Sequence, residues 1–146
     1  DQATRFEMGP DFRPSPGASG WQLSTPPVLA IAPLAASLEH FDTVGLTALR
    51  QKSVALTGYL EALVRARLSR KVTILTPEDP AARGAALSLR LEVDRNRART
   101  IFDGLRTRGI VPDWREPGVI RAAPVPFYNS FDDAWTFVDA LQSELG

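Results

Sequence analysis

The sequence predicts a two-layer α+β fold, in which helices pack on one small, largely antiparallel sheet. Two patterns lead to this prediction. Apolar residues recur at helical spacing in four segments, and short segments rich in β-branched or alternating apolar residues lie between them. The predicted order is helix, helix, strand, strand, helix, strand, strand, helix. With 146 residues, the chain is long enough for one such domain with a core of its own.

The N-terminal segment differs in composition from the rest of the chain. Residues 9–20 contain three prolines and three glycines, a composition that favours extended and turn conformations. We therefore expect residues 1–26 to form an extended arm or linker and residues 27–146 to form the small folded domain. The chain opens without an initiator methionine, which suggests a processed chain or a piece of a longer one.

Two helices are expected after the arm. From residue 27 the apolar side chains become dense, which predicts a helix that is buried over much of its circumference. Asp42 or Thr43 is the expected N-cap of a second helix over about residues 44–68. In that helix leucines recur at helical spacing, and charged residues take the other side.

Two strands and a third helix follow. Residues 71–75 are rich in β-branched side chains, and residues 86–93 alternate apolar and polar side chains, as in a strand with one buried face. Asp94 is a good N-cap for the third helix, and Gly109 is placed to end it.

The C-terminal part of the chain predicts two more strands and a last helix. The strands are expected at residues 110–114 and 118–123. Ser130 and Asp133, three residues apart before an apolar helical pattern, predict a capping box at the start of the last helix.

Composition excludes several classes of function. Seventeen basic and seventeen acidic side chains cancel, which gives no reason to expect a nucleic acid or an anionic membrane as partner. The chain has no cysteine and one histidine, so a disulfide framework and a Cys- or His-rich metal site are excluded. No apolar run approaches the roughly 18 to 20 residues that span a bilayer, and the N-terminus lacks a leader pattern. We expect a soluble, cytoplasmic protein.

The stretch GWQLSTPPVLA, residues 20–30, places two hydroxyls directly before two prolines. One interpretation is a capped helix start, because Ser24 and Thr25 are good N-cap residues and proline is favoured at the first helical positions. The other is an anion site, since a helix N-terminus attracts anions. The prolines lack N–H groups, so the donors would be the Ser24 and Thr25 hydroxyls and the Trp21 indole N–H. Such a set suits a phosphate.

Arg121 lies between apolar residues in GVIRAAP. A guanidinium keeps its charge in such a setting and therefore requires an anionic partner. Glu116 is an internal candidate for a salt bridge. The alternative is a bidentate clamp on a substrate carboxylate, which the planar fork of arginine matches. Both interpretations stay open at the level of sequence.

Three other polar residues carry weaker signals. His40, near the end of an apolar helix, is expected to be packed or to face the helix dipole rather than to act in catalysis. Asp79, in TPEDP, is expected to be a turn residue. Arg83, just before a strand, is expected in a solvated turn or at an interface.

Four motifs together resemble one known family. They are LSTPP at 23–27, LRQKSVALTGYLEAL at 49–63, TPEDPAARGAALSL at 76–89 and DWREPGVIRAAPVPFYNSF at 113–131. In this combination they are similar to the C-terminal part of kynureninases, and the resemblance runs with few gaps from about residue 5 to residue 133.

The resemblance implies the fold of type I pyridoxal 5'-phosphate enzymes, with this chain as their small C-terminal domain and residues 1–26 as an arm from the large domain. Kynureninases hydrolyse L-kynurenine to anthranilate and L-alanine in tryptophan catabolism, and a preference for kynurenine or 3-hydroxykynurenine stays open. The resemblance also implies a homodimer, in which Thr25, with Ser24 and Trp21 beside it, serves cofactor or substrate binding in the neighbouring subunit. Arg121 resembles the residue that holds the substrate's α-carboxylate.

The resemblance also implies that the main catalytic groups lie outside this chain. The Schiff-base lysine of the family belongs to the larger domain, and neither Lys52 nor Lys71, the two lysines present, has its sequence context. A pyridoxal phosphate enzyme requires that lysine. We therefore expect no catalytic residue here and an isolated chain without activity.

Two alternatives remain beside this interpretation. One is the small domain of another type I pyridoxal phosphate enzyme, such as a cysteine desulfurase or an aminotransferase. The other is a stand-alone α+β binding module, which the Pro/Gly-rich arm disfavours, because such an arm gains little by being ordered without a larger body. We also expect apolar surface that a large domain or a second subunit would cover, so self-association is plausible.

Overall fold

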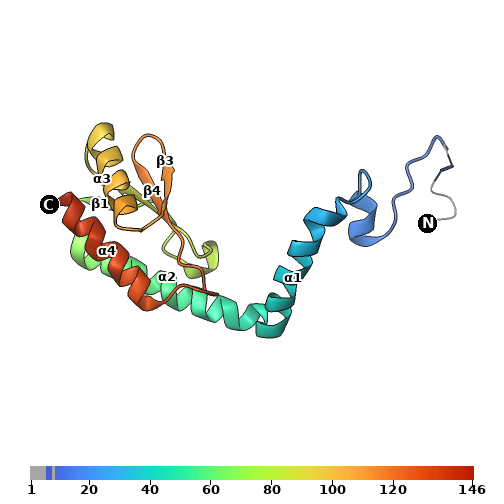
Figure 1. Cartoon of the computed structure of the whole chain (residues 1–146), viewed down its shortest axis with the longest axis horizontal. Coiled ribbons are helices and arrows are strands. Elements are labelled where there is room, and N and C mark those ends of the chain that lie inside the picture. Colours follow the sequence, from blue (N-terminus) through green and yellow to red (C-terminus); the bar gives the residue numbers. More distant parts are fainter. Residues whose placement is uncertain (1–5, 8) are drawn as a thin grey trace. The chain divides into compact units, whose positions relative to one another are not determined.

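The computed structural model describes residues 6, 7 and 9–146, and its contacts divide the chain into two compact units. The first unit is Asp1–Thr43 and the second is Val44–Gly146. Figure 1 labels their helices and strands. The division falls after Thr43, so the first long helix groups with the N-terminal segment. The domain boundary expected between residues 26 and 27 stays a prediction about the larger protein.

The described residues of the first unit form one short and one long helix. The short one is the 3-10 helix η1 (Gly17–Trp21), and the long one is α1 (Val28–Val44). The N-cap predicted at Asp42 or Thr43 is wrong, because α1 continues through both residues. The next helix instead begins after Gly45, which turns the chain at the end of α1. The φ of Gly45 is 82°, a conformation that glycine adopts without strain.

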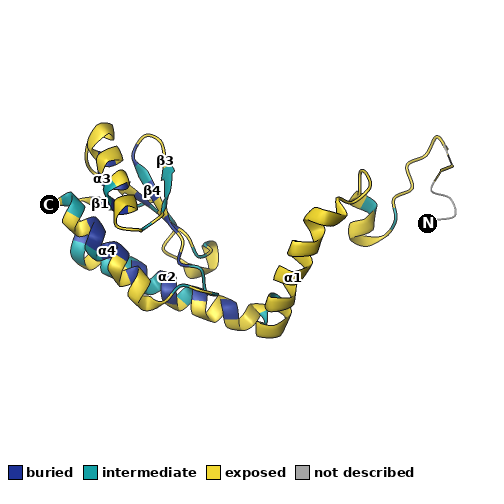
Figure 2. Cartoon of the chain, viewed as in Figure 1, coloured by how far each residue is buried: buried dark blue, intermediate teal, exposed yellow. Residues whose placement is uncertain are grey.

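Helix α1 differs from its prediction in burial. The sequence predicted a helix buried over much of its circumference, but α1, all of whose residues are described, has none that is buried (Figure 2). Leu29, for example, is 92% exposed. The segment is a helix, as predicted, but within its own unit no other element covers the apolar side chains of α1.

The second unit has the predicted two-layer α+β architecture. Its elements in chain order are α2 (Leu46–Leu68), β1 (Val72–Ile74), the 3-10 helix η2 (Pro80–Ala82), β2 (Leu87–Leu91), α3 (Arg95–Thr107), β3 (Asp113–Arg115), β4 (Val119–Ala122) and α4 (Phe131–Leu145). The four strands form one sheet in the order β1-β2-β4-β3, and each neighbouring pair is antiparallel. Together with α1, the order of helices and strands is the one expected from sequence.

Two of the predicted helix caps are confirmed in atomic detail. The Asp94 carboxylate accepts hydrogen bonds from the backbone N–H groups of Asn96 and Arg97, both at 3.0 Å, at the start of α3. At the start of α4, the Ser130 hydroxyl accepts from the Asp133 N–H at 3.1 Å, and the Asp133 carboxylate accepts from the Ser130 N–H at 2.8 Å. This reciprocal pair is the capping box that the sequence predicted.

The core lies between the helices of this unit and one face of its sheet. Helices α2 (green) and α4 (red) run side by side in Figure 1, and α3 packs against α4. Alternate residues of β2 enter the core, as do Ile120 and Ala122 of β4. The buried residues of the two central strands are Leu87, Leu89, Leu91, Ile120 and Ala122. The residues between them therefore point to the opposite face of the sheet.

Candidate functional site

The face of the sheet that points away from the core carries polar side chains. In the strand register Arg121 of β4 lies opposite Ser88 of β2 on one side and Asp113 of β3 on the other. Directly opposed residues of antiparallel strands point to the same face. The pleat of the sheet therefore gathers a cation, a hydroxyl and a carboxylate on one surface, which we call the polar sheet face (Ser88, Arg90, Asp113, Arg115 and Arg121).

Arg121 has an internal anionic partner, and it is not the predicted one. Its Nε donates to Oδ2 of Asp113 at 2.7 Å, and its Nη2 makes an ion pair with the same oxygen. Glu116 instead binds Arg95 of α3 with both carboxylate oxygens, each at 2.8 Å. The salt bridge between Arg121 and Glu116 is therefore a wrong prediction.

The apolar setting of Arg121 is also explained by the pleat. Its sequence neighbours Ile120 and Ala122 are in the core, whereas the side chain of Arg121 is 44% exposed on the other face. A linear reading of GVIRAAP suggests a guanidinium among apolar groups, but alternation along a strand separates the two kinds of side chain. The requirement for an anion from burial is therefore weaker than the sequence suggested.

Asp113 is shared between two arginines. Besides Arg121, the Nε of Arg115 donates to Oδ2 of Asp113 at 2.9 Å. The hydrogen bond from Arg121, together with the nearby charge of Arg115, outweighs desolvation and holds the pKa of Asp113 below its ordinary value. Two guanidinium charges and one carboxylate leave this cluster with a net charge of +1. The polar sheet face therefore attracts an anion.

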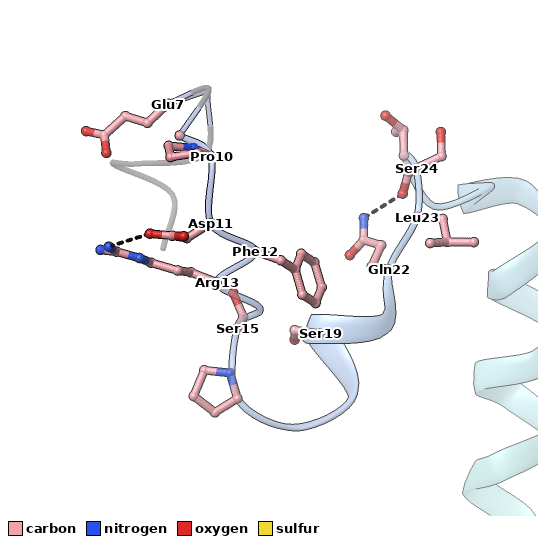
Figure 3. A pocket seen from close by; sticks show the side chains of 13 residues that line it. Glu7, Pro10, Asp11, Phe12, Arg13, Ser15, Ser19, Gln22, Leu23 and Ser24 are labelled. Carbon is pink, nitrogen blue, oxygen red and sulfur yellow. Dashed lines mark hydrogen bonds and ion pairs between the residues drawn. The ribbon is translucent and has the colours of Figure 1, made fainter.

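The predicted phosphate donors Ser24 and Thr25 line a pocket in the first unit. Figure 3 shows the segment around this open pocket, which has a volume of about 1160 Å³. Ser15, Ser19 and Gln22 also line it, together with Arg13, whose guanidinium lies 3.6 Å from the Asp11 carboxylate. The wall therefore offers hydroxyl and guanidinium donors, which can bind phosphate, and it also carries the carboxylates of Glu7 and Asp11.

Trp21, the third predicted donor, is placed differently. It is 86% exposed and does not belong to the lining of the pocket. Its neighbour Gln22 does, and the Gln22 side-chain amide donates to the backbone carbonyl of Ser24 at 2.8 Å (Figure 3). Sequence reasoning missed Gln22, because its role depends on a local turn that composition does not specify.

Capping of α1 by Ser24 or Thr25 is a wrong prediction. The helix begins at Val28, and the carbonyl of Pro27 accepts from the N–H groups of Ala30 and Ile31 at 2.9 and 3.0 Å. A residue that precedes proline is disfavoured in the helical region, which keeps Thr25 extended. The hydroxyls of Ser24 and Thr25 thus lie ahead of the helix, where they line the pocket described above.

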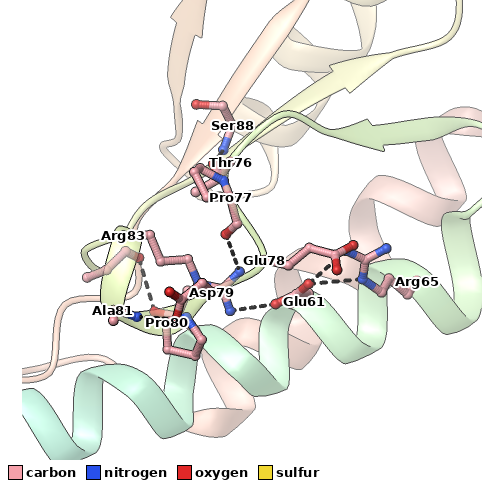
Figure 4. A network of polar contacts seen from close by, with 12 residues as sticks. Glu61, Arg65, Thr76, Pro77, Glu78, Asp79, Pro80, Ala81, Arg83 and Ser88 are labelled. Carbon is pink, nitrogen blue, oxygen red and sulfur yellow. Dashed lines mark hydrogen bonds and ion pairs between the residues drawn. The ribbon is translucent and has the colours of Figure 1, made fainter.

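A partly buried ion pair supports the loop that leads into β2. Arg83 is 4% exposed and donates to Glu61 of α2 at 2.5 Å and to the Pro77 carbonyl at 3.1 Å (Figure 4). Glu61 also accepts from Arg65 at 2.9 Å, and Arg65 pairs with Glu78 at 2.6 Å. The predicted solvated turn is therefore wrong for Arg83, and the predicted interface stays a prediction. Arg83 holds loop 76–84 to helix α2.

The charge state of this network is fixed. Burial acts to raise the pKa of Glu61, but hydrogen bonds from Arg83 and Arg65 and their charges outweigh burial and lower it. Glu61 is therefore ionised at neutral pH. Asp79, the predicted turn residue, accepts from the Ala81 N–H at 2.8 Å within the same loop. The single sequence signal for the network was an arginine directly after two alanines and before a glycine.

The two lysines occupy structural positions. Lys52 is an exposed residue of α2, and Lys71 Nζ donates to the carbonyl of Gly146 at the end of α4. Among the described residues, no group of three His, Asp or Glu side chains is arranged to hold a metal ion. In that same part of the chain no helix has the length and apolar character needed to cross a bilayer.

The fold resembles that of a solved structure. The chain matches a glycine decarboxylase (P-protein) of the glycine cleavage system in inhibitor-bound form, with a TM-score of 0.54 and 19% sequence identity, over 73% of this chain and 24% of that one. At this identity the likeness concerns the fold alone. It confirms the predicted fold class, α+β with helices on a small antiparallel sheet.

The family follows from closer relatives. Residues 49–141 match the family model of the kynureninase C-terminal domain, and the chain belongs to this family. It is 56% identical over 143 residues to a kynureninase of Xanthomonas euvesicatoria pv. vesicatoria (strain 85-10), and 53% identical over 146 residues to one of Stenotrophomonas maltophilia (strain K279a). These matches cover 98% and 100% of this chain but 34% of each relative. The chain thus spans about a third of their length and corresponds to their C-terminal part.

Proposed function

We propose that the protein to which this chain belongs is a kynureninase, which hydrolyses L-kynurenine or 3-hydroxykynurenine with pyridoxal 5'-phosphate as cofactor. The observation that carries the proposal is the position of Arg121. It lies on the polar sheet face, in a cluster of net positive charge. The kynureninase name of the relatives supplies the substrate. Arg121 binds the α-carboxylate of that substrate.

In this proposal Arg121 binds the α-carboxylate and orients the substrate. Its planar fork takes both oxygens of a carboxylate, so it fixes the plane of that group as well as its position. Fixing the carboxylate sets the direction of the bonds at the neighbouring carbon. Orientation of this kind converts binding energy into a reactive geometry.

Some residues of the pocket in the first unit suit the phosphate end of the cofactor. Ser24 and Thr25 bring two hydroxyl donors to one wall, and the pocket also holds Arg13. When bound, pyridoxal phosphate supplies an electron sink for negative charge beside the substrate's amino group. We propose that Ser24 and Thr25 hold the phosphate, that Trp21 contributes from outside the pocket lining, and that in a homodimer this segment serves the neighbouring subunit's site.

The lysine that the cofactor requires is supplied by the remainder of the protein. Lys71 is engaged at the C-terminus, and Lys52 lies on the outside of α2. We therefore propose that the chain alone is inert and becomes part of an active cytoplasmic enzyme only with the other two thirds of the length of its relatives.

A chimera tests this proposal. Residues 1–146 replace the matching third of the Xanthomonas euvesicatoria relative, and anthranilate release from L-kynurenine is followed by its fluorescence. We expect the chimera to release anthranilate and the chain alone to release none. Alanine, aspartate and cysteine serve as control substrates for the other enzymes of this fold. Anthranilate from the isolated chain, or a chimera that folds and binds cofactor but leaves kynurenine intact, contradicts the proposal.

Substitution of Arg121 tests the role of the arginine. Arg121→Lys in the chimera keeps the charge but removes the fork, so we expect KM for L-kynurenine to rise by roughly tenfold or more, since a hydrogen bond to a charged group contributes about 1.5–3 kcal/mol. Arg90→Lys, on the same face in β2, is the matched control and should leave KM within about twofold. Equal effects of the two substitutions would remove the assignment of Arg121.

A further inference from the structure

The guanidinium of Arg121 is held along one edge. Asp113 takes the Nε–H at 2.7 Å and also contacts Nη2, and both contacts go to the single oxygen Oδ2. A guanidinium has five N–H donors in one plane. The side edge of the fork is therefore occupied, while the end edge, made by Nη1 and the outer N–H of Nη2, faces away from Asp113.

We infer that Asp113 is a positioning residue, which fixes the side edge of Arg121 so that the end edge of the fork receives the substrate's α-carboxylate. This inference rests on the proposed function, because it takes Arg121 as the carboxylate holder. Asp113 itself does not touch the substrate. It acts by restricting the rotamers of Arg121, whose long side chain is otherwise free to sample several directions.

The backbone makes this contact independent of a ligand. Asp113 and Arg121 are opposed residues in the β3–β4 register, so the antiparallel ladder fixes the distance between their Cα atoms. The fork is therefore oriented before substrate arrives, which lowers the entropy lost on binding.

Charge balance distinguishes positioning from competition. If Asp113 were paired with Arg121 alone, it would neutralise the arginine and compete with the substrate carboxylate. Asp113 is instead shared, because Arg115 also contacts its Oδ2 at 2.9 Å. The three residues carry a net charge of +1, which one substrate carboxylate brings to zero. Because its pKa is lowered by the hydrogen bond from Arg121, Asp113 keeps its own charge at neutral pH. Both carboxylates thus have a cationic partner at the same time.

An ordinary surface salt bridge predicts a different result from a positioning contact. Exposed ion pairs contribute little to the free energy of unfolding, and both side chains here are nearly half exposed. Loss of an ordinary pair therefore changes neither stability nor kinetics appreciably. Loss of a positioning contact leaves stability unchanged but weakens the binding of substrate.

The experiment uses Asp113→Asn and Asp113→Glu in the chimera defined above. We expect Asp113→Asn to raise KM for L-kynurenine about tenfold, with kcat within about twofold and the urea midpoint unchanged. Asp113→Glu restores the carboxylate and should recover part of the lost affinity. Glu116→Gln is the control, because it removes another exposed ion pair of the same hairpin and should leave KM unchanged. An unchanged KM in Asp113→Asn, or the same rise in Glu116→Gln, overturns the inference.

Arg121→Lys separates the two levels of the proposal. In that background Asp113→Asn should raise KM by less than twofold further, because the fork that Asp113 orients is gone. If Arg121→Lys raises KM and Asp113→Asn alone does not, the positioning role fails and the function of Arg121 stands. If Arg121→Lys has no effect on KM, both fail.

A second measurement avoids dependence on the chimera. In the 146-residue chain, the hydrogen bond to Asp113 should slow exchange of the Arg121 Nε proton with solvent. We expect about tenfold faster exchange by NMR in Asp113→Asn and no change in Glu116→Gln. Equal exchange in the original chain and in Asp113→Asn overturns the inference directly.

Discussion

Helices α1 and α2 are both rich in apolar residues, but only α2 buries them. Helix α2 places its charged residues on one side and buries seven residues on the other, whereas α1 has no buried residue and has apolar side chains on all sides. Residue type is thus a poor guide to burial when a packing surface is lacking. We therefore expect the free energy of unfolding to come mainly from Val44–Gly146, and we expect α1 to contact a surface outside its own unit.

Core truncation gives the largest expected contrast between the two units. Leu89 of β2 is fully buried, so Leu89→Ala should lower the free energy of unfolding by about 3 kcal/mol through lost burial and a new cavity. Leu29→Ala in α1 removes the same atoms from an exposed position and should change it by less than about 0.5 kcal/mol. Urea unfolding followed by circular dichroism measures both.

Concentration serves as a control for this comparison. If the chain self-associates through α1, Leu29→Ala lowers the apparent stability at high protein concentration and not at low concentration. A loss for Leu29→Ala that is equal to that of Leu89→Ala at every concentration would show that α1 packs within a single chain, and the contrast between the units would be wrong.

Removal of helix caps gives an intermediate effect. Ser130→Ala deletes one half of the capping box of α4 and should cost about 1 kcal/mol. Ser24→Ala and Thr25→Ala delete hydroxyls of the same kind, but α1 begins only at Val28, so no loss of stability is expected. Thermal unfolding of the three variants tests this. A loss from Thr25→Ala as large as that from Ser130→Ala would restore the capping role that the structure contradicts.

The smallest expected effect is on the pH dependence of stability. Hydrogen bonds from the Ser130 backbone and from Asn129 lower the pKa of Asp133. A carboxyl whose folded pKa is depressed contributes stability that is present above its unfolded pKa, about 3.9, and is lost as pH falls through the folded value. We expect Asp133→Asn to flatten the decline of stability below about pH 5. Parallel curves for the original chain and the variant would contradict this.

Much of the fold could be predicted because its signals are local. Alternation predicted β2 and helical spacing predicted α2, while Asp94, Ser130 and Asp133 marked the starts of two helices within a few residues of sequence. Each of these features depends on short-range geometry. The position of Arg121 on a strand could be predicted for the same reason. Its exposure could not, because that depends on which face of the sheet packs against the core.

The partners of the site residues could not be predicted, because they depend on register. Asp113 and Arg121 are eight residues apart, and they meet only because β3 and β4 pair in one of several possible alignments. The pairing of Arg83 with Glu61 depends likewise on how loop 76–84 lies on α2. The start of α1 was misplaced for a local reason, since two consecutive prolines move the helix three residues past Thr25.

The alternation along β4 also restricts how this segment can change during evolution. Ile120 and Ala122 are in the core, and Arg121 stands between them on the other face. A single inserted or deleted residue in the turn before β4 would exchange these faces, so that the guanidinium would enter the core and the isoleucine would leave it. We expect variation in this hairpin to occur by substitution, or by insertions of two residues, and single-residue length changes to be eliminated by selection.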